Sequence, residues 1–351
     1  MLADLAALPG SLGRIFYFIV LPMLLLVLLG YVVQRRLGLD MPTLTRLNFY
    51  LVVPALIYFS VVNSKVPLGD VAKVIVFSLA MIALLAVVTD VVARLRGVPR
   101  DQRRVMLMTT MFYNSGNYGL PLQEMAFRSA GLGSLAASLQ VFTILCQNFT
   151  TFTLGVVLVS SGRGQGPPTA TDGGRGPRHW RRNLMQIVRF PPIYALAAAL
   201  LTVQARRLLG PSAPAVEQAL APFWDAIGFV KDAFVAVALA TLGAQLAMTA
   251  RPTRGYPIVL SVLLRLVGGP AVGLGLVCLL HHFWGVHGFL AQMLLISTAP
   301  PTAVNSLLLC LEFKNHPDFA ARAVFYSTLL SPLTVTLTIY LAQSGALQVF
   351  Q

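Results

Sequence analysis

Charged residues are scarce in this chain of 351 residues: Asp, Glu, Lys and Arg make up 11% of it, while hydrophobic residues make up 56%. Soluble domains carry about a quarter of their residues as these four charged types. So few charges cannot cover the surface of a water-soluble protein of this size, whereas a lipid bilayer favours an apolar exterior. The composition therefore indicates an integral membrane protein, which we expect to be all-α.

Cysteines and catalytic motifs are equally sparse. The three cysteines, Cys146, Cys278 and Cys310, lie in apolar segments and form no CxxC pair, which argues against a disulfide framework or a zinc site. The chain contains no GxSxG, no HExxH and no paired Asp-rich motif, the patterns expected of a membrane-embedded enzyme. We therefore expect no metal, no cofactor and no enzymatic activity.

The positive charge has a better explanation than nucleic-acid binding. The formal net charge is +14, but the basic residues fall mostly between apolar stretches and do not form a stripe interleaved with aromatic residues. That placement is typical of the topology signals of membrane proteins. We expect a lipid bilayer, and no nucleic acid, as a partner of this chain.

Ten segments are long and apolar enough to be transmembrane helices, since about 20 helical residues cross the hydrocarbon layer. They are 15–34, 45–63, 71–93, 105–127, 135–159, 189–209, 222–248, 257–280, 288–311 and 322–343. A Gly-, Pro- and Arg-rich stretch at 160–188 predicts a flexible linker. It divides the chain into two groups of five helices, 1–159 and 189–351. Because no basic cluster precedes the first apolar segment, we interpret that segment as a helix and not as a signal peptide.

Charge placement predicts the orientation of these helices. Eighteen of the 26 Lys and Arg residues follow helices one, three, five, seven and nine. By the positive-inside rule this side faces the cytoplasm, so both chain ends are expected outside the cytoplasmic membrane. An odd number of helices per group inverts the second group relative to the first. A faint internal match, VVQRRLG at 32–38 and VQARRLLG at 203–210, fits such an inverted repeat.

Helices four and nine are interrupted at their centres by residues that disfavour continuous helix. Proline removes a backbone donor and clashes with the preceding turn, and glycine loosens the backbone. Interrupted segments at corresponding places in two halves indicate a transporter's binding site at mid-membrane, although a simple kink without function is the alternative. The candidate substrate-site residues are Asn114, Ser115, Gly116, Asn117, Tyr118, Gly119, Pro121, Pro300, Pro301, Thr302 and Asn305.

The chemistry of such a break favours an anion. Each break exposes unpaired N–H groups at the start of the following half-helix, where partial positive charge suits a carboxylate. Asn114, Asn117 and Asn305 add amide donors and acceptors, and Ser115 and Thr302 add hydroxyls. We expect the substrate to contact these side chains.

The interrupted segments resemble the auxin efflux carrier family, which includes bacterial organic-acid permeases. NSGNYGLP at 114–121 matches that family's N-x-G-N-x-G-L-P pattern, PPTAVNS at 300–306 is similar to its second crossover, and FPPIYA at 190–195 and LGAQL at 242–246 also fit. The resemblance implies two inverted five-helix repeats whose fourth and ninth helices cross at mid-membrane. It also implies a homodimer and elevator-type transport of a small organic anion, such as a mono- or dicarboxylate or an auxin-like acid. The short linker favours the bacterial permeases over the plant members.

The sequence says less about the ion that drives transport than about the substrate site. The related bile-acid sodium symporters share the fold but place an acidic residue near the ninth-helix crossover, and 300–306 contains none. We therefore expect a proton-coupled or potential-driven carrier, with sodium-coupled symport of the bile-acid type as the alternative and a membrane-embedded enzyme or a channel as further ones. Ionisable residues inside a membrane are costly, so Asp90 and Glu124 are the coupling candidates. The alternative for Glu124 is a side chain near the outer mouth that reaches water or Arg128. Asp90 is also expected to pair with Arg94, one turn on.

Three other charges fall within the expected spans. Lys231 and Asp232 are adjacent in helix seven, and we expect each to need a separate partner. Arg265 in helix eight is either an interior cation or a side chain that extends to the membrane interface. Gly269 and Gly273 in the same helix form a small-residue packing face.

Overall fold

The computed structural model describes residues 11–63, 68–160, 191–210, 213–248, 256–345 and 349. These residues form helices and short π-helical turns, labelled η, and no strand. The predicted linker lies outside them from residue 161 onward. Seven helices are long and apolar enough to cross a membrane, in agreement with the all-α membrane class: Ser11–Leu37, Met41–Asn63, Gly69–Leu95, Gly133–Val159, Ala221–Met248, Pro257–Trp284 and Pro317–Gln343.

Helices coincide with the expected segments of the first half of the chain. The uninterrupted ones are η1 (Phe16–Val20) with α2 (Leu21–Leu37), α3 (Met41–Leu47) with η2 (Asn48–Val52) and α4 (Val53–Asn63), α5 (Leu68–Leu95), and α8 (Gly133–Thr150) with η3 (Thr151–Gly155) and α9 (Val156–Ser160). The apolar side chains of α2 that would face lipid are half exposed or more, for example Leu25, Leu28 and Leu29.

The second half is built from similar helices. These are α11 (Pro191–Leu209), α12 (Ala213–Ala219), α13 (Ala221–Asp232), α14 (Phe234–Met248), α15 (Tyr256–Leu263) with η5 (Leu264–Gly268) and α16 (Gly269–Trp284), and α19 (Pro317–Gln343). Proline lies in the first turn of α13, α16 and α19, where its missing N–H would have no helical partner anyway.

Both segments that the sequence predicts to be interrupted consist of two short helices. The first comprises α6 (Arg100–Met111) and α7 (Gly119–Ala126), and the second α17 (Gly288–Ser297) and α18 (Val304–Glu312). The residues between the members of each pair are not helical. The breaks therefore coincide with the Gly-, Asn- and Pro-rich stretches of the sequence.

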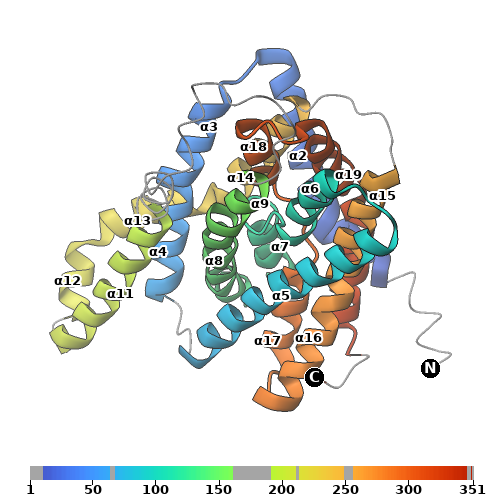
Figure 1. The fold of residues 1–351 in the computed structure, drawn as a ribbon. Helices are drawn as coiled ribbons and strands as arrows, with labels where there is room; N and C mark the ends of the chain where they lie inside the picture. Colours follow the sequence, from blue (N-terminus) through green and yellow to red (C-terminus); the bar gives the residue numbers. More distant parts are fainter. Residues whose placement is uncertain are drawn as a thin grey trace.

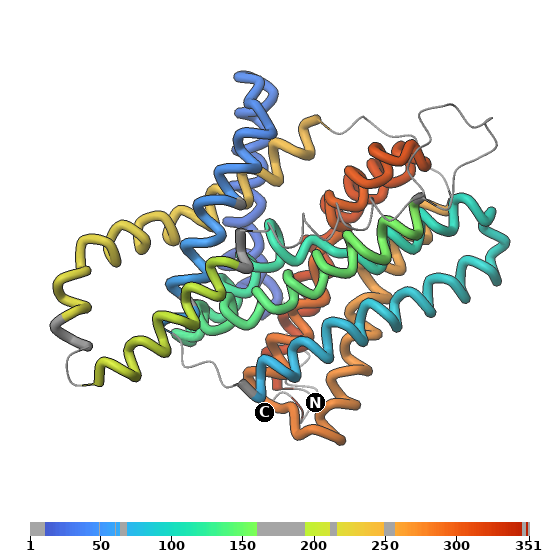
Figure 2. Tube along the Cα trace, turned by 60° about the vertical axis from the view of Figure 1, so that its left-hand side comes forward, coloured from blue at the N-terminus to red at the C-terminus, as the bar shows by residue number. Residues whose placement is uncertain are grey.

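The helices pack in two groups. In one, α2 lies against α14, and α4 lies against α11 and α13; Figure 1 shows α4, α11 and α13 together on one side of the molecule. In the other, α5 packs on α6, α8 and α16, and α19 packs on α15, α17 and α18. In Figure 2 the yellow-green and yellow helices of the first group extend away from the orange and red C-terminal helices.

Glycines allow the closest contact in the first group. A Cβ at Gly30 of α2 would lie 2.1 Å from the carbonyl oxygen of Ala240, and one at Gly243 of α14 would lie 1.9 Å from that of Val27. Only residues without a side chain let two helix backbones approach so closely. Gly243 belongs to the LGAQL segment, so part of that motif serves helix packing.

Candidate functional site at the helix crossing

The two breaks meet and pair with each other. The backbone becomes extended at Phe112, directly after α6, and Tyr113 forms an isolated antiparallel bridge with Thr302. The N–H of Asn114 donates to the carbonyl of Pro301 at 2.8 Å, and the N–H of Ala303 donates to the carbonyl of Phe112 at 3.0 Å. Non-helical backbone at this depth must find its partners within the protein. Here each break supplies partners for the other.

Side chains fix the crossing further. The hydroxyls of Thr302 and Ser306, both in the second interrupted segment, donate to the carbonyls of Thr109 and Met108 near the end of α6, at 2.8 and 3.1 Å. These carbonyls are among the last of a helix, which lack complete helical bonding. The side-chain amide of Gln140 in α8 donates to the carbonyl of Ser115 at 3.1 Å and holds the non-helical segment between α6 and α7. The crossing is thus a bonded junction.

A cavity of about 90 Å³ lies beside this junction. None of its lining residues is charged, and most carry an amide or hydroxyl or belong to the breaks themselves. They are Thr45, Tyr113, Asn114, Ser115, Gly116, Asn117, Ile144, Gln147, Asn148, Thr151, Gln245, Ala303, Val304, Asn305 and Leu308. Since α18 begins at Val304, its N-terminal turn borders the cavity and gives it partial positive charge.

Two pairs of asparagines meet at the cavity, and three of the four residues line it. Asn48 of η2 donates from its side-chain amide to the side-chain oxygen of Asn117 at 3.0 Å. Asn305 of α18 stands 3.4 Å from the side-chain oxygen of Asn148, a long hydrogen bond. Neutral amides of this kind can both donate and accept. They can therefore exchange their partners for a ligand's oxygens without leaving a buried charge behind.

Two other buried polar groups at the cavity lack a hydrogen bond of normal geometry among the described residues, although the Tyr113 hydroxyl lies close to Gln147 and Ser297. Gln147 is 3% exposed and Tyr113 is 1% exposed. Neither the amide of Gln147 nor the hydroxyl of Tyr113 makes a hydrogen bond of normal geometry to a described residue. Buried polar groups are almost always hydrogen-bonded, so those that are not need an explanation such as a ligand or ordered water.

The candidate residues fall into two sets. Asn114, Ser115, Gly116, Asn117 and Asn305 line the cavity. The others are not among its lining residues but build the crossing: Tyr118, Gly119, Pro121, Pro300, Pro301 and Thr302.

The roles of the second set are visible in their contacts. The hydroxyl of Tyr118 accepts a hydrogen bond from Ser331 of α19 at 3.2 Å. A Cβ at Gly119 would lie 3.1 Å from the ring of Pro300, so glycine lets the two breaks approach. Pro121 lies in the first turn of α7, where no helical partner for an N–H is needed.

Sequence reasoning missed the contribution of helix five. Gln147, Asn148 and Thr151 all line the cavity, and so do Thr45 of α3 and Gln245 of α14. The available signal was the polar run QNFTT at 147–151, inside an otherwise apolar segment. Gln245 lies in LGAQL, so this motif supplies both a packing glycine and a cavity residue.

The coupling candidates lie outside the cavity. Asp90 forms ion pairs with Arg94 at 2.7 Å, as expected, and with Arg103 at 3.3 Å. Glu124 is half-buried in α7 and forms no ion pair within the described part of the chain.

The expectation of separate partners for Lys231 and Asp232 is wrong. Their side chains form an ion pair of 2.7 Å. Both residues lie in the last turn of α13, where the long Lys231 side chain reaches the exposed Asp232 carboxylate. Arg265, by contrast, is confirmed as an interior cation, with 0% of its surface exposed.

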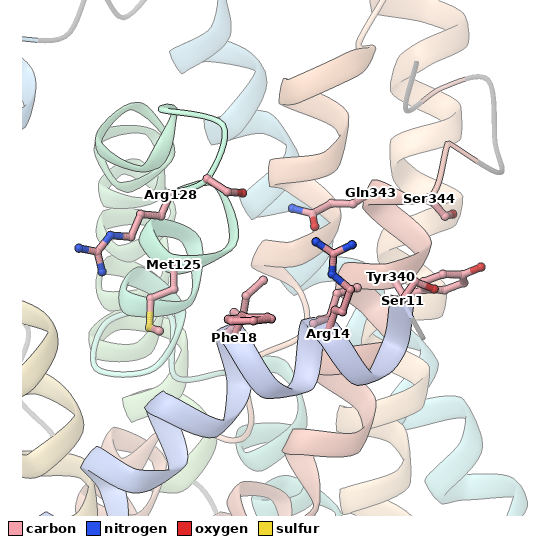
Figure 3. A pocket seen from close by; sticks show the side chains of 11 residues that line it. Ser11, Arg14, Phe18, Met125, Arg128, Tyr340, Gln343 and Ser344 are labelled. Carbon is pink, nitrogen blue, oxygen red and sulfur yellow. The ribbon is translucent and has the colours of Figure 1, made fainter. Parts of the chain in front are cut away.

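A second, larger cavity of about 600 Å³ lies at the end of α7 and α19 (Figure 3). Ser11 and Arg14 line it from the first helix, Met125 and Arg128 from the region of α7, and Gln343 from the end of α19. In Figure 3 Arg14 points toward Gln343, and Arg128 lies across the cavity beside Met125. No residue of the crossing lines this cavity. It does show that the two ends of the described chain lie on the same side of the molecule.

Long apolar helices and two broken helices that cross define a polytopic helical membrane protein whose irregular backbone borders a buried polar cavity. A family model described as membrane transport protein matches residues 179–339. This part of the chain matches a family of transporters, and the resemblance to the auxin efflux carriers is confirmed there. The match includes the break between α17 and α18, while the 114–121 motif lies outside it. A comparison with curated proteins gave no match.

Proposed function

We propose that the chain is a secondary transporter that moves a small organic anion across the cytoplasmic membrane, with the substrate held at the helix crossing. The observation that carries this proposal is the cavity beside the paired breaks: it is uncharged, it is lined by amides and hydroxyls, and it borders the start of α18. Half-helix N-termini that point at an anionic group are the usual substrate sites of such carriers.

The size of the cavity favours a small substrate. Its volume of about 90 Å³ is far below the roughly 300–1,000 Å³ of pockets that hold drug-sized ligands. A short mono- or dicarboxylate suits this space better than an auxin-like acid with an aromatic ring system. Gln147 and Tyr113 provide the unpaired groups that such a carboxylate would satisfy.

The proposed topology is ten transmembrane helices in two inverted five-helix repeats. Helices occupy the ten expected segments, and the broken ones are the fourth and the ninth. Ser11 and Ser344 line the same cavity, so the two ends of the described chain lie on one side, as an even number of spans requires. Combined with the positive-inside rule, this supports the proposal that both ends lie outside the cell.

The packing supports alternating access of the elevator type. Thr45 and Gln245 of the crossing cavity belong to the group of α2, α4, α11, α13 and α14, whereas its other lining residues belong to the group of α5, α8 and α19. A substrate at this boundary would be exposed to either side by movement of one group against the other. Thr45, Gln245 and Leu308 lie toward the ends of their helices on the basic side, so we assign this state as the one that faces the cytoplasm.

Glu124 is the preferred proton carrier if transport is proton-coupled. Asp90 is engaged with two arginines, whereas Glu124 forms no ion pair within the described residues and lies five residues after the start of α7. A carrier driven by membrane potential needs neither. Sodium-coupled symport is the competing function, but no acidic side chain lines the crossing cavity.

Uptake into liposomes tests the proposal. Purified protein should give saturable uptake of a radiolabelled short dicarboxylate and should show counterflow, whereas a channel would carry currents far above carrier turnover. Asn117→Ala and Asn305→Ala should abolish saturable uptake with the fold intact. Asn63→Ala, which changes an exposed asparagine whose amide donates only to Phe59, is the matched control. Unchanged substrate affinity in both site variants would refute the site.

The proposed homodimer needs a separate measurement. Mass determination of the protein in lipid nanodiscs should give two chains per particle. A mass of one chain at all protein concentrations would contradict the dimer without affecting the site.

A further inference from the structure

Helix eight carries a buried guanidinium that the proposed substrate contacts do not explain. Arg265 has 0% of its surface exposed and forms no ion pair with any carboxylate of the described residues. Its Nη1 donates to the carbonyl of Thr110 at 3.2 Å, and its Nη2 donates to the carbonyl of Thr298. Its guanidinium carbon lies 4.5 Å from the centre of the Tyr113 ring. A buried charge is costly unless it is compensated, so the compensating groups identify its role.

Both acceptor carbonyls lie at the ends of half-helices. Thr110 is the last residue but one of α6, and Thr298 directly follows the last residue of α17. The terminal carbonyls of a helix lack helical partners and carry partial negative charge. The guanidinium therefore bridges the negative ends of both broken helices, and the face of Tyr113 adds a third favourable contact.

The local structure of helix eight makes room for this arrangement. Arg265 lies in the π-helical turn η5, and such turns are frequent at functional sites. A Cβ at Gly269 would lie 2.6 Å from Nη2 of Arg265, so a larger residue there would displace the guanidinium. A Cβ at Gly273 would lie 2.6 Å from Cγ2 of Thr298. The two glycines of the small-residue face thus admit Arg265 and the end of α17.

We propose that Arg265 is a built-in cation of the crossing, which takes the place that a coupling metal cation occupies in other carriers with broken helices. In such carriers the C-terminal ends of half-helices coordinate sodium; here the guanidinium already satisfies them. This inference rests on the proposed transporter function. It adds that transport needs no sodium, and that a permanent positive charge lies behind Tyr113, the wall of the substrate cavity, where it favours anions over cations.

Cation-dependent stability tests this role without a known substrate. The unfolding temperature is measured in sodium chloride, choline chloride and low-millimolar guanidinium chloride at equal ionic strength. The wild type should give equal values in sodium and choline. Arg265→Ala should unfold at a lower temperature and should regain stability in guanidinium or sodium but not in choline. Arg206→Ala, which removes an arginine paired with Glu217, should show no difference between the three cations.

Transport of the anion identified by uptake provides the second readout. Arg265→Met, which keeps most of the volume and removes the charge, should lose uptake by about tenfold or more, the equivalent of at least one hydrogen bond to a charged group. Arg265→Lys, which keeps the charge, should recover part of it. If Arg265→Ala does not fold, Arg265→Lys and Arg265→Met still decide the question.

Sodium-specific stabilisation or sodium-dependent uptake in the wild type would overturn the inference. Wild-type kcat and KM in Arg265→Met would overturn it as well. An unfolding temperature of Arg265→Ala that does not distinguish the cations would also contradict it. Lack of uptake of any organic anion by the wild type would instead refute the proposed function, because the cation measurements do not involve a substrate.

Discussion

Replacing Gln147 with Leu removes an amide that is buried at the crossing cavity with both of its polar atoms unpaired. Leaving a buried polar group unsatisfied costs about 1–3 kcal/mol. If substrate is the missing partner, the substrate-free protein bears this cost, and Gln147→Leu should stabilise it by about 1 kcal/mol or more. For a protein of this size that corresponds to a rise of roughly 2 °C in unfolding temperature.

The same substitution should weaken substrate binding. A hydrogen bond to a charged group contributes about 1.5–3 kcal/mol, which corresponds to an increase in Kd of roughly 10- to 150-fold. Unfolding temperatures are measured in detergent without substrate, and Kd by titration with the carboxylate identified by uptake. A residue that only supports the fold cannot raise stability and lower affinity together, so the opposite signs make the test specific.

Gln140→Leu is the matched control. Gln140 lies two turns earlier on α8, is equally buried, and donates to the carbonyl of Ser115 at 3.1 Å. Its removal breaks a bond and leaves a carbonyl unpaired, so it should lower the unfolding temperature. If Gln147→Leu also lowers it and leaves Kd unchanged, Gln147 is structural and the cavity is not the substrate site.

Three further predictions concern packing, movement and pH. Gly243→Ala should lower stability by about 1–3 kcal/mol, because its Cβ would lie 1.9 Å from a carbonyl oxygen of α2. Gly275→Ala is the control: it has open space around it and should be neutral or slightly stabilising in thermal unfolding. Equal effects of the two substitutions would contradict the contact between α2 and α14. In a variant without native cysteines, cross-linking Arg14→Cys to Gln343→Cys across the larger cavity should stop uptake but not substrate binding. Cross-linking Tyr58→Cys to Thr202→Cys, whose native side chains meet at 2.9 Å within one packing group, should leave uptake intact. Uptake by both cross-linked variants would argue against an elevator. Burial opposes ionisation of Asp101, but hydrogen bonds from backbone N–H groups and from His316 hold its pKa below the ordinary value. Its contribution is therefore complete above the unfolded pKa and is lost as pH falls. Thermal unfolding between pH 6 and 3 should show a loss of less than about 1 kcal/mol, as for exposed pairs, that Asp101→Asn lacks; an identical pH profile in the variant would contradict the contact.

Much of the crossing could be predicted because its residues are unusual for a membrane helix. Gly, Pro and Asn between 114 and 121, and prolines at 300 and 301, mark the two breaks in the sequence, and the structure has non-helical backbone at both. The faint internal match has a structural counterpart as well. Both copies end a helix on a glycine in the left-handed conformation, Gly38 with φ 64° and Gly210 with φ 50°, which is a common way to end a helix.

The rest could not be predicted because it depends on which surfaces meet. Gln147 and Asn148 lie in a continuous helix, and their polarity alone does not tell whether they face lipid, a neighbouring helix or a cavity. The ion pair of Lys231 and Asp232 depends on the side-chain conformations of two adjacent residues at the end of α13, which the sequence does not specify. For Arg265 the sequence left two interpretations open, and only the positions of Thr110 and Thr298 decide between them.

The two sets of residues at the crossing lead to different expectations for changes in substrate. Thr302, Ser306 and Gln140 hold backbone groups of the junction, so their replacement alters the geometry for every substrate at once. Asn148 and Thr151 line the cavity from α8 and η3 and hold no backbone group of the junction, since Asn148 meets only the side chain of Asn305 in a long hydrogen bond. Neutral side chains of other sizes can therefore replace them without breaking the junction. Selectivity among anions is therefore expected to vary with helix five, while the paired breaks and Arg265 retain the general preference for negative charge. Exchange of Asn148 and Thr151 for smaller residues should broaden the range of carboxylates taken up, and a range that changes only when the breaks are mutated would refute this division.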